Sequence, residues 1–537
     1  MRAFRIVGIF VFLLLIVSLF LALIDISPAE PDDLGISIPL QKDFPTPSLY
    51  INPAVPSSLR IEASKANYRH DDDPRDATVT LDMVRKDEAD SEWVYALVGP
   101  FSTLMDDVSS RELLDFWHGS DAGPFAGSPL RMAESTLEAL TALWGKPAPG
   151  VVRTVFEDQL TDELWRSIPS WGIVPFEELE PRLKVLSLDG NSPIRNDFKQ
   201  DAYPLIVHFR ASDPSFVLPA TNRDPSKMTT VMLTGVTALV RATAAKMERH
   251  GMTYPGEEIR PLLLSSDILH INNEVPFYSM CDVPDIKQKE LVFCSRMKYM
   301  ELLTYIDTDV VELTGDHFAD YGDQAMLETL QVYEQAGIPY YGGGADLEQA
   351  RNPLVMEHHG NKIAFIGCND KYAYATAAET EPGAAPCDYD YMRARIMELR
   401  SQGYVVIATF QYEEYNHPQA TEIQMQEFRW QADSGAQIVS GSQAHFAQVM
   451  EFYNGSFIHY GLGNLFFDQM GRNDGGIDNI RQQFVDEHVI YDGRHISTEL
   501  HTFILMDYSQ PRPMNEAERA KFLRYYFEQS GWRVPVQ

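Results

Sequence analysis

Residues 309–322 read DVVELTGDHFADYG, an apolar run followed by a polar loop. The apolar side chains of Val310, Val311 and Leu313 are typical of a buried strand. The loop that follows carries Asp316 and His317. In an α/β sheet, ligands bind beyond the carboxyl ends of the strands. This stretch therefore predicts a sheet with a polar site at its edge.

Similar apolar runs recur on both sides of this stretch and alternate with amphipathic runs. Strands are predicted at 231–234, 262–265, 310–313, 363–366, 404–409 and 437–439, and helices at 324–336, 392–402 and 422–432. Such alternation predicts an α/β sheet domain. Two β-hairpins are also predicted, with their turns at 358–361 and 453–456.

Acidic, amide and imidazole side chains gather in the loops after the predicted strands. They include Asp267, His270, Asn273, Glu274, Asp316, His317, Glu414, Gln443 and His445. These groups suit a hydrolytic metal site, and they suit a polar binding pocket equally well. The residues alone leave both interpretations open.

The first residues of the chain predict a membrane-facing segment. The apolar run 6–24 has 19 residues, which as a helix span about 28 Å, close to the thickness of a bilayer core. Arg2 and Arg5 precede the run and acidic residues follow it. The positive-inside rule then places the N-terminus in the cytoplasm. Because the run is longer than the apolar region of a usual signal peptide, it predicts an uncleaved anchor at 1–27, followed by a linker at 28–45. A cleaved signal peptide is the alternative, and both interpretations place the remaining chain outside the cytoplasmic membrane.

The charge of the chain excludes one class of partner. Its 537 residues include 44 Lys and Arg and 77 Asp and Glu, which gives a net charge of −33. A chain this acidic repels phosphate backbones, so no nucleic-acid partner is expected.

Four cysteines form two local pairs, Cys281 with Cys294 and Cys368 with Cys387. Four cysteines allow three pairings. In an oxidising compartment, disulfides within the two local pairs are the favoured prediction, because each pair brackets a loop-like stretch.

Beyond these local signals, residues from about 229 to 470 resemble the CapA-type capsule-synthesis proteins, which act in poly-γ-glutamate synthesis. Residues 309–322 are similar to that family's pattern Asp-Val-Val-x-Leu-Ala-Asn-Asn-His-x-x-Asp-x-Gly. Residues 341–351, 441–445 and 453–466 are similar to three further motifs of the family. The resemblance implies a calcineurin-like metallophosphoesterase-type αββα sandwich over residues 229–508, and it leaves 509–537 as a C-terminal tail.

Several positions depart from the family's pattern of metal ligands. The family's Gly-Asp at the end of the first strand is Gly235-Val236 here, and its His-Trp-Gly-x-Glu begins with Phe410. The first histidine of its His-Pro-His is Gln443. Valine and phenylalanine cannot hold a metal, whereas a two-metal centre needs ligands around two ions about 3.5–4 Å apart. We therefore expect one divalent metal ion at most, with Val236 and Phe410 filling the space of two lost ligands.

The resemblance also implies roles for the polar residues that remain. Asp316, His317 and Glu414 are the candidate catalytic residues; Glu274, Gln443 and Asn464 are candidate ligand-binding residues; Asp316, His317 and His445 are candidate metal ligands. All of them are expected in one cleft at the carboxyl ends of the sheet.

Residues 46–215 are predicted to form a smaller α/β domain. Residues 95–101, 110–119 and 201–205 resemble periplasmic solute-binding proteins of the phosphate-binding type. An unrelated α/β domain is the alternative.

Together these features predict a single-pass cell-membrane protein whose globular part is extracellular or periplasmic. Its predicted function is capsule or exopolymer synthesis of the poly-γ-glutamate type, with a degenerate metal site that acts in binding or assembly. The expected partners are an anionic polymer or its precursor and other capsule-synthesis proteins. The alternative is a metal-dependent hydrolase or transferase of the metallophosphoesterase superfamily.

Overall fold

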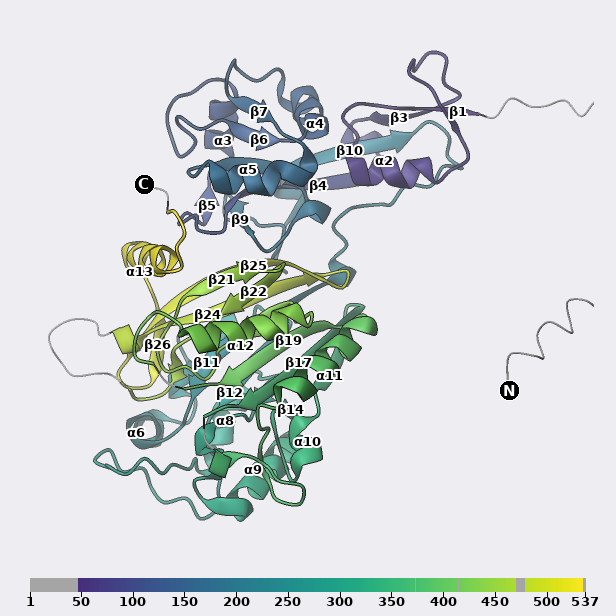
Figure 1. The fold of residues 1–537 in the computed structure, drawn as a ribbon. Coiled ribbons are helices and arrows are strands. Elements are labelled where there is room, and N and C mark those ends of the chain that lie inside the picture. Colours follow the sequence, from purple (N-terminus) through teal and green to yellow (C-terminus); the bar gives the residue numbers. More distant parts are fainter. Residues whose placement is uncertain (1–46, 372, 414, 470–478, 535–537) are drawn as a thin grey trace, which may run out of the picture. The chain divides into compact units, whose positions relative to one another are not determined.

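A computed structural model describes residues 47–371, 373–413, 415–469 and 479–534 (Figure 1). The predicted anchor (1–27), the predicted linker (28–45) and Glu414 lie outside these residues. Among the helices within the described ranges, none has the length and apolar character needed to cross a membrane.

The first part of the described chain is built on one mixed sheet of ten strands. Its main order is β2-β1-β3-β10-β4-β8-β6-β7, and β9 pairs with both β4 and β5. The strands are β1 (Ser48–Ile51), β2 (Arg69–His70), β3 (Val79–Met83), β4 (Ser91–Pro100), β5 (Asp107–Val108), β6 (Leu130–Met132), β7 (Val152–Thr154), β8 (Trp171–Pro175), β9 (Leu183–Leu188) and β10 (Ile206–Ala211). The helices packed on them are α2 (Ser57–Ser64), α3 (Ser110–Trp117), α4 (Glu134–Trp144) and α5 (Leu160–Arg166).

The second part contains an eight-stranded sheet and a six-stranded sheet. The eight-stranded sheet has the order β14-β13-β12-β11-β24-β25-β26, with β23 beside β11. Its strands are β11 (Met228–Thr237), β12 (Ile268–Asn273), β13 (Val310–Glu312), β14 (Tyr340–Tyr341), β23 (Asn464–Phe466), β24 (Gln482–Tyr491), β25 (Arg494–Met506) and β26 (Gln510–Pro513).

The six-stranded sheet has the order β16-β17-β19-β20-β22-β21. Its strands are β16 (Leu354–His358), β17 (Asn361–Asn369), β19 (Val405–Gln411), β20 (Ile438–Ser440), β21 (Met450–Tyr453) and β22 (Ser456–His459). The hairpins predicted at 358–361 and 453–456 join β16 to β17 and β21 to β22. Two short strands, β15 (Gly343–Gly344) and β18 (Gly383–Ala384), pair with each other outside both sheets.

Successive side chains of the central strands alternate between an inner and an outer apolar layer. In β17, Ile363 and Phe365 belong to a core shared with Val231 and Leu233 of β11. The intervening Ala364 belongs to a second cluster on the outer face. Because strand side chains point to opposite faces in turn, the two sheets pack face to face through the shared core.

Helices cover the outer face of each sheet. The eight-stranded sheet packs against α6 (Arg241–His250), α8 (Met300–Tyr305) and α9 (Gly322–Ala336). The six-stranded sheet packs against α10 (Leu347–Arg351), α11 (Tyr389–Ser401) and α12 (Glu422–Asp433), and Figure 1 shows α11 and α12 alongside β17 and β19. The prediction of a mixed α/β protein is confirmed.

One predicted strand is wrong. Residues 262–265 were expected as a strand, but Arg260–Leu263 forms the short helix α7, and the strand begins only at Ile268. A short apolar run fits a buried helix turn as well as a strand. Pro261 stands in the first turn of α7, where its missing N–H and fixed φ favour a helix start.

Residues 509–537, predicted as a tail, include strand β26 and helix α13 (Glu516–Gln529). Phe522 and Phe527 of α13 lie in the core between the two sheets. The ring of Phe101, from the first part of the chain, lies 6.1 Å from that of Phe527. Arg519 of α13 pairs with Asp106 at 2.7 Å. The end of the chain therefore joins the two parts.

Both predicted disulfides are confirmed, Cys281–Cys294 and Cys368–Cys387. The first closes a loop beside the candidate site, and the second ties the end of β17 to the start of α11.

Free-thiol labelling of the denatured, non-reduced protein should detect no thiol. A Cys368→Ala, Cys387→Ala double variant is expected to lose about 3 kcal/mol of stability in the chain-entropy model, measured by urea unfolding. Four reactive thiols in the native protein would contradict the pairing.

Candidate functional site

The candidate site lies where parallel strands of both sheets end. Glu274 follows β12, the loop with Asp316 and His317 follows β13, and the loop with Gln443 and His445 follows β20. Because carboxyl ends of parallel strands meet at one edge, the fold brings these loops together. Gly315 permits a close approach of two of these loops, since a Cβ there would lie 2.3 Å from the backbone oxygen of Glu274.

Glu274, Asp316 and His317 form the centre of the site. One ligand atom from each lies within 4.8 Å of the other two. The carboxylates of Glu274 and Asp316 are fully buried. Neither oxygen of Glu274 makes a hydrogen bond within the described part of the chain. A buried carboxylate without hydrogen bonds is costly unless a cation lies near it.

His317 is held by Asp320. Its Nδ1 lies 2.7 Å from Asp320 Oδ2, which also accepts the backbone N–H of Phe293 at 2.7 Å. The imidazole therefore donates from Nδ1, and its Nε2 faces the other way. Burial lowers the pKa of His317, but the hydrogen bond to Asp320 and the charges of Glu274 and Asp316 outweigh it and raise that pKa to about 9.

Lys371 supplies a buried ammonium group to the site. Its Nζ lies 2.7 Å from Asp316 Oδ2, and the two side chains are 8% and 1% exposed. Burial raises the pKa of Asp316, but the charges of Lys371 and His317 outweigh burial and leave it below its ordinary value. Sequence reasoning missed Lys371. The only available signal was its place two residues after β17, at the same edge as the other loops.

His445 connects Glu274 to Asn464. Its Nδ1 lies 2.7 Å from Asn464 Oδ1, and its Nε2 lies 3.4 Å from Glu274 Oε1. The amide oxygen can only accept, so His445 donates from Nδ1 and turns Nε2 toward the carboxylate. Asn464 thus orients an imidazole.

A second polar network lies beneath the site, around the fully buried Glu312. Ser442 and Thr314 donate hydroxyl hydrogen bonds to its carboxylate at 2.5 and 2.6 Å. His270 Nε2 lies 3.3 Å from Glu312 Oε2. The predicted residue Gln443 reaches this network by donating to Thr314 Oγ1 at 3.3 Å. Glu312 lies in the quoted stretch 309–322. Nothing in the strand pattern there indicated that its side chain would be buried at the centre of a polar network.

An apolar wall closes one side of the site. Val236 packs in a small cluster with Phe293 and Phe467. The Phe293 ring lies 4.8 Å from the His317 ring, and the Phe467 ring lies 5.1 Å from the His445 ring. Val236 thus belongs to the apolar cluster whose two phenylalanine rings contact the histidines.

The expectation for Phe410 is wrong. Its ring stacks on Phe428 of α12 at 4.3 Å, in the outer layer, so it fills no ligand space. The physical reason is the period of two along β19. The next residue, Gln411, pairs across the sheet with Asn369, whose side chain donates to the Thr314 backbone oxygen. Cross-strand partners share a face, so Gln411 points toward the site.

The structure thus brings together six of the seven predicted site residues: Glu274, Asp316, His317, Gln443, His445 and Asn464. Glu414 lies outside the described residues. A divalent ion fits the centre of this set, because Glu274 is a buried carboxylate without hydrogen bonds beside a second carboxylate and an imidazole. Oxygen and imidazole ligands of this kind suit Mn²⁺ or Zn²⁺.

Comparison with known proteins gives the following relationships. Residues 230–469 match the family model described as "Bacterial capsule synthesis protein PGA_cap". The capsule biosynthesis protein CapA of Bacillus anthracis is 26% identical over 267 residues, which cover 47% of this chain and 63% of that protein. The PGA biosynthesis protein CapA of Bacillus subtilis (strain 168) is 27% identical over 229 residues, which cover 41% of this chain and 59% of that protein. The chain therefore spans about three fifths of the length of these relatives.

Among solved structures, the 5'-nucleotidase precursor of Thermus thermophilus is similar over 56% of this chain and 59% of that chain. The TM-score is 0.31 and the sequence identity is 10%. A similarity of this size supports no inference about function.

Proposed function

We propose that this chain acts in the synthesis of a capsule or exopolymer of the poly-γ-glutamate type, because residues 230–469 match the model of the bacterial capsule synthesis protein family. Its site would bind or help to assemble the polymer or a precursor rather than turn over a phosphoester. Its partners would be that anionic polymer and other capsule-synthesis proteins.

The ion pair of Lys371 with Asp316 is the observation that carries this proposal. In a two-metal phosphoesterase, carboxylates of this kind hold metal ions. Here a protein ammonium group neutralises Asp316, and Val236 lies in an apolar wall. Room and charge remain for one divalent ion at most, held by Glu274, Asp316 and His317. Such an ion would supply positive charge for an anionic group.

A bound cation also resolves a charge conflict. The chain carries a net charge of −33, which repels a polyanion such as polyglutamate. Lys371 and a divalent ion would together offer local positive charge at the site. The polymer, or its carboxylate-bearing precursor, would then be recognised through that charge.

The finer architecture is part of the same proposal. The two packed sheets with outer helices over 229–508 would be a calcineurin-like sandwich, and residues 46–215 would be a solute-binding-like module. An N-terminal anchor at 1–27 would place both on the outer side of the cell membrane, with 28–45 as a linker.

The alternative function is a metal-dependent hydrolase or transferase. The unsatisfied carboxylate of Glu274 favours it, since such a group is suited to hold a catalytic ion. In that case Asp316, His317 and Glu414 would act on the substrate.

Metal analysis of the purified chain, combined with a phosphoesterase assay, separates the two functions. After loading with Mn²⁺, we expect at most one weakly bound ion at this site, lost in Glu274→Gln and in Asp316→Asn, because each removes a carboxylate ligand. A nitrophenyl phosphodiester should not be turned over. Glu301→Gln, an exposed glutamate of α8, is the matched control and should bind as the native chain does.

The cellular arm of this test uses the host organism. Deleting the gene should lower extracellular polymer, and Glu274→Gln should fail to restore it while Glu301→Gln succeeds. Two tightly held ions with rapid phosphoester turnover would establish the hydrolase instead. Unchanged polymer after deletion would contradict the role in synthesis.

A further inference from the structure

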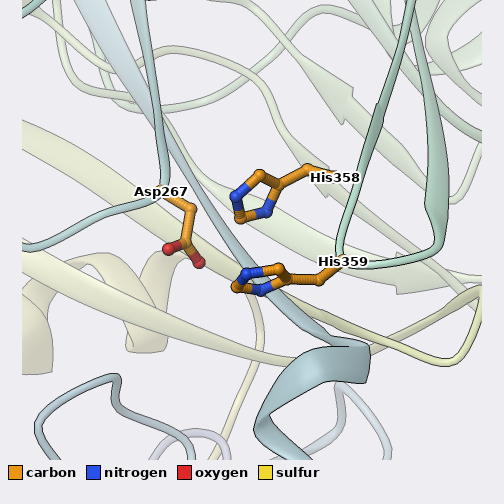
Figure 2. Close-up of side chains that lie close together, drawn as sticks. All are labelled: Asp267, His358 and His359. Atoms are coloured by element: carbon orange, nitrogen blue, oxygen red, sulfur yellow. The ribbon is translucent and has the colours of Figure 1, made fainter.

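Three further residues with metal-ligand side chains meet at the opposite edge of the sheets. They are Asp267, directly before β12, and His358 and His359, at the turn of the β16–β17 hairpin (Figure 2). One ligand atom of each lies within 4.8 Å of the other two. Glu274 follows the other end of β12, so this cluster is separate from the candidate site.

The hydrogen bonds of His359 fix which ring nitrogen is available. Its Nδ1 lies 2.7 Å from the backbone oxygen of Met228. A carbonyl oxygen only accepts, so Nδ1 carries the proton and donates it. In a neutral imidazole, the lone pair is then on Nε2, and a backbone carbonyl on Nδ1–H is the usual support of a metal-binding histidine.

His358 is held in the same state by Thr229. The Thr229 hydroxyl donates its single proton to the backbone oxygen of His358 at 3.0 Å. The same hydroxyl oxygen lies 3.1 Å from His358 Nδ1, so the imidazole must be the donor of that bond. Among the described residues, neither His358 Nε2 nor His359 Nε2 has a hydrogen-bond partner.

Asp267 is held in place by groups that leave lone pairs free. Its Oδ2 accepts the backbone N–H of Thr230 at 2.8 Å and the Thr230 hydroxyl at 3.1 Å. Its Oδ1 accepts from Asn196, in the first part of the chain, at 3.1 Å. A carboxylate has about four acceptor positions, so Oδ1 keeps capacity for a cation. Figure 2 shows both imidazole rings beside this carboxylate.

We propose that Asp267, His358 and His359 form a binding site for a divalent transition-metal ion of the zinc type. Two imidazoles and one carboxylate with an open fourth position are a donor set that zinc prefers. Bonds of about 2.0–2.1 Å require ligand atoms closer together than 4.8 Å, and rotation of these partly exposed side chains supplies the movement.

The bound ion would join the two sheets. Asp267 directly precedes β12 of the eight-stranded sheet, and the histidines belong to the hairpin of the six-stranded sheet. Through Asn196 the site also reaches the first part of the chain. Zinc that binds only the folded chain stabilises it by mass action. The site would therefore be a structural metal site, independent of the proposed function.

The test uses the purified full-length chain, stripped of metal with a chelator and titrated with ZnCl₂ in a calorimeter. A Glu274→Gln background removes a ligand from the other candidate site. This chain is still expected to bind one zinc ion, at Asp267, His358 and His359. In that background, His358→Asn and His359→Asn should each weaken zinc binding by about 100-fold or more. Asn suits residue 359, whose φ of 47° is a conformation that Asn adopts readily.

Control measurements separate ligand loss from misfolding. His118→Gln, an exposed histidine after α3, should leave the affinity unchanged. Without zinc, each variant should melt like the parent, and zinc should raise the melting temperature only of chains with both histidines. X-ray absorption should find two imidazole nitrogens at about 2.0–2.1 Å. Equal affinity in the histidine variants, or no zinc bound by the Glu274→Gln chain, would overturn the proposal.

Discussion

Replacing Lys371 with methionine is expected to lower the free energy of unfolding by about 3–5 kcal/mol at neutral pH. The substitution leaves Asp316, which is 1% exposed, without the ammonium group 2.7 Å away. Leaving one buried carboxylate unpaired destabilises a protein by much more than the intact ion pair stabilises it. Equilibrium denaturation in urea measures the loss.

The pH dependence of this loss has a defined direction. Burial works against ionisation of Asp316, but Lys371 and His317 keep its pKa below the ordinary value. A carboxyl whose folded pKa is depressed stabilises the protein above its unfolded pKa, about 3.9. The stabilisation is lost as the pH falls through the folded pKa. The difference in free energy of unfolding between the native chain and the Lys371→Met variant should therefore narrow below about pH 4.

Two companion variants make the result specific. Adding Asp316→Asn to Lys371→Met should recover most of the loss, because it removes the unpaired charge. Lys362→Met, at an exposed position of β17, the strand that precedes Lys371, should change stability by no more than about 0.5 kcal/mol. A Lys371→Met chain as stable as the native protein would show that Asp316 is compensated by another group.

Replacing Glu312 with alanine is expected to lower stability by an amount of the same size, about 3–5 kcal/mol. Glu312 is fully buried and accepts from Ser442, Thr314 and Asn272. Its removal leaves the hydroxyls of Ser442 and Thr314 without their acceptor, and it opens a cavity. Asn272 and His270 keep second partners in Ser442 and Tyr341. Buried donors without partners each cost about 1–3 kcal/mol. Chemical denaturation at neutral pH measures the effect.

Acid should reduce this effect as well. Burial raises the pKa of Glu312, but the hydrogen bond and charge of His270 and the hydroxyls of Ser442 and Thr314 bring it below its ordinary value. Its contribution is therefore present above about pH 4.3 and disappears as the pH falls through the folded pKa. Glu312→Gln should lose less than Glu312→Ala, and Glu301→Ala on exposed α8 should lose almost nothing. Equal stability of Glu312→Ala and the native chain would mean that the network contributes no net stability.

The sequence predicted the parts of this protein whose signal is local. Apolar runs and amphipathic runs marked central strands and helices of the second part, where five of the six predicted strands exist, but the long strands β24 and β25 were not predicted. The family motifs placed Asp316, His317, Gln443, His445 and Asn464 at one edge of the sheet. Glu274 was assigned to that edge as a polar residue that follows a predicted strand. The two disulfides followed from close cysteine pairs. The strand predicted at 262–265 failed because a short apolar run has no period that separates helix from strand.

Tertiary structure decided which side chains meet. Nothing in the local pattern pairs Lys371 with Asp316, 55 positions earlier, or turns Phe410 to the outer layer while Gln411 faces the site. The Asp267–His358–His359 cluster also joins residues of two different sheets. Local period and composition determine which elements form and which polar residues stand at their ends. Charge pairing and ligand sets depend on the register and packing of distant strands, which the sequence specifies only through the whole fold.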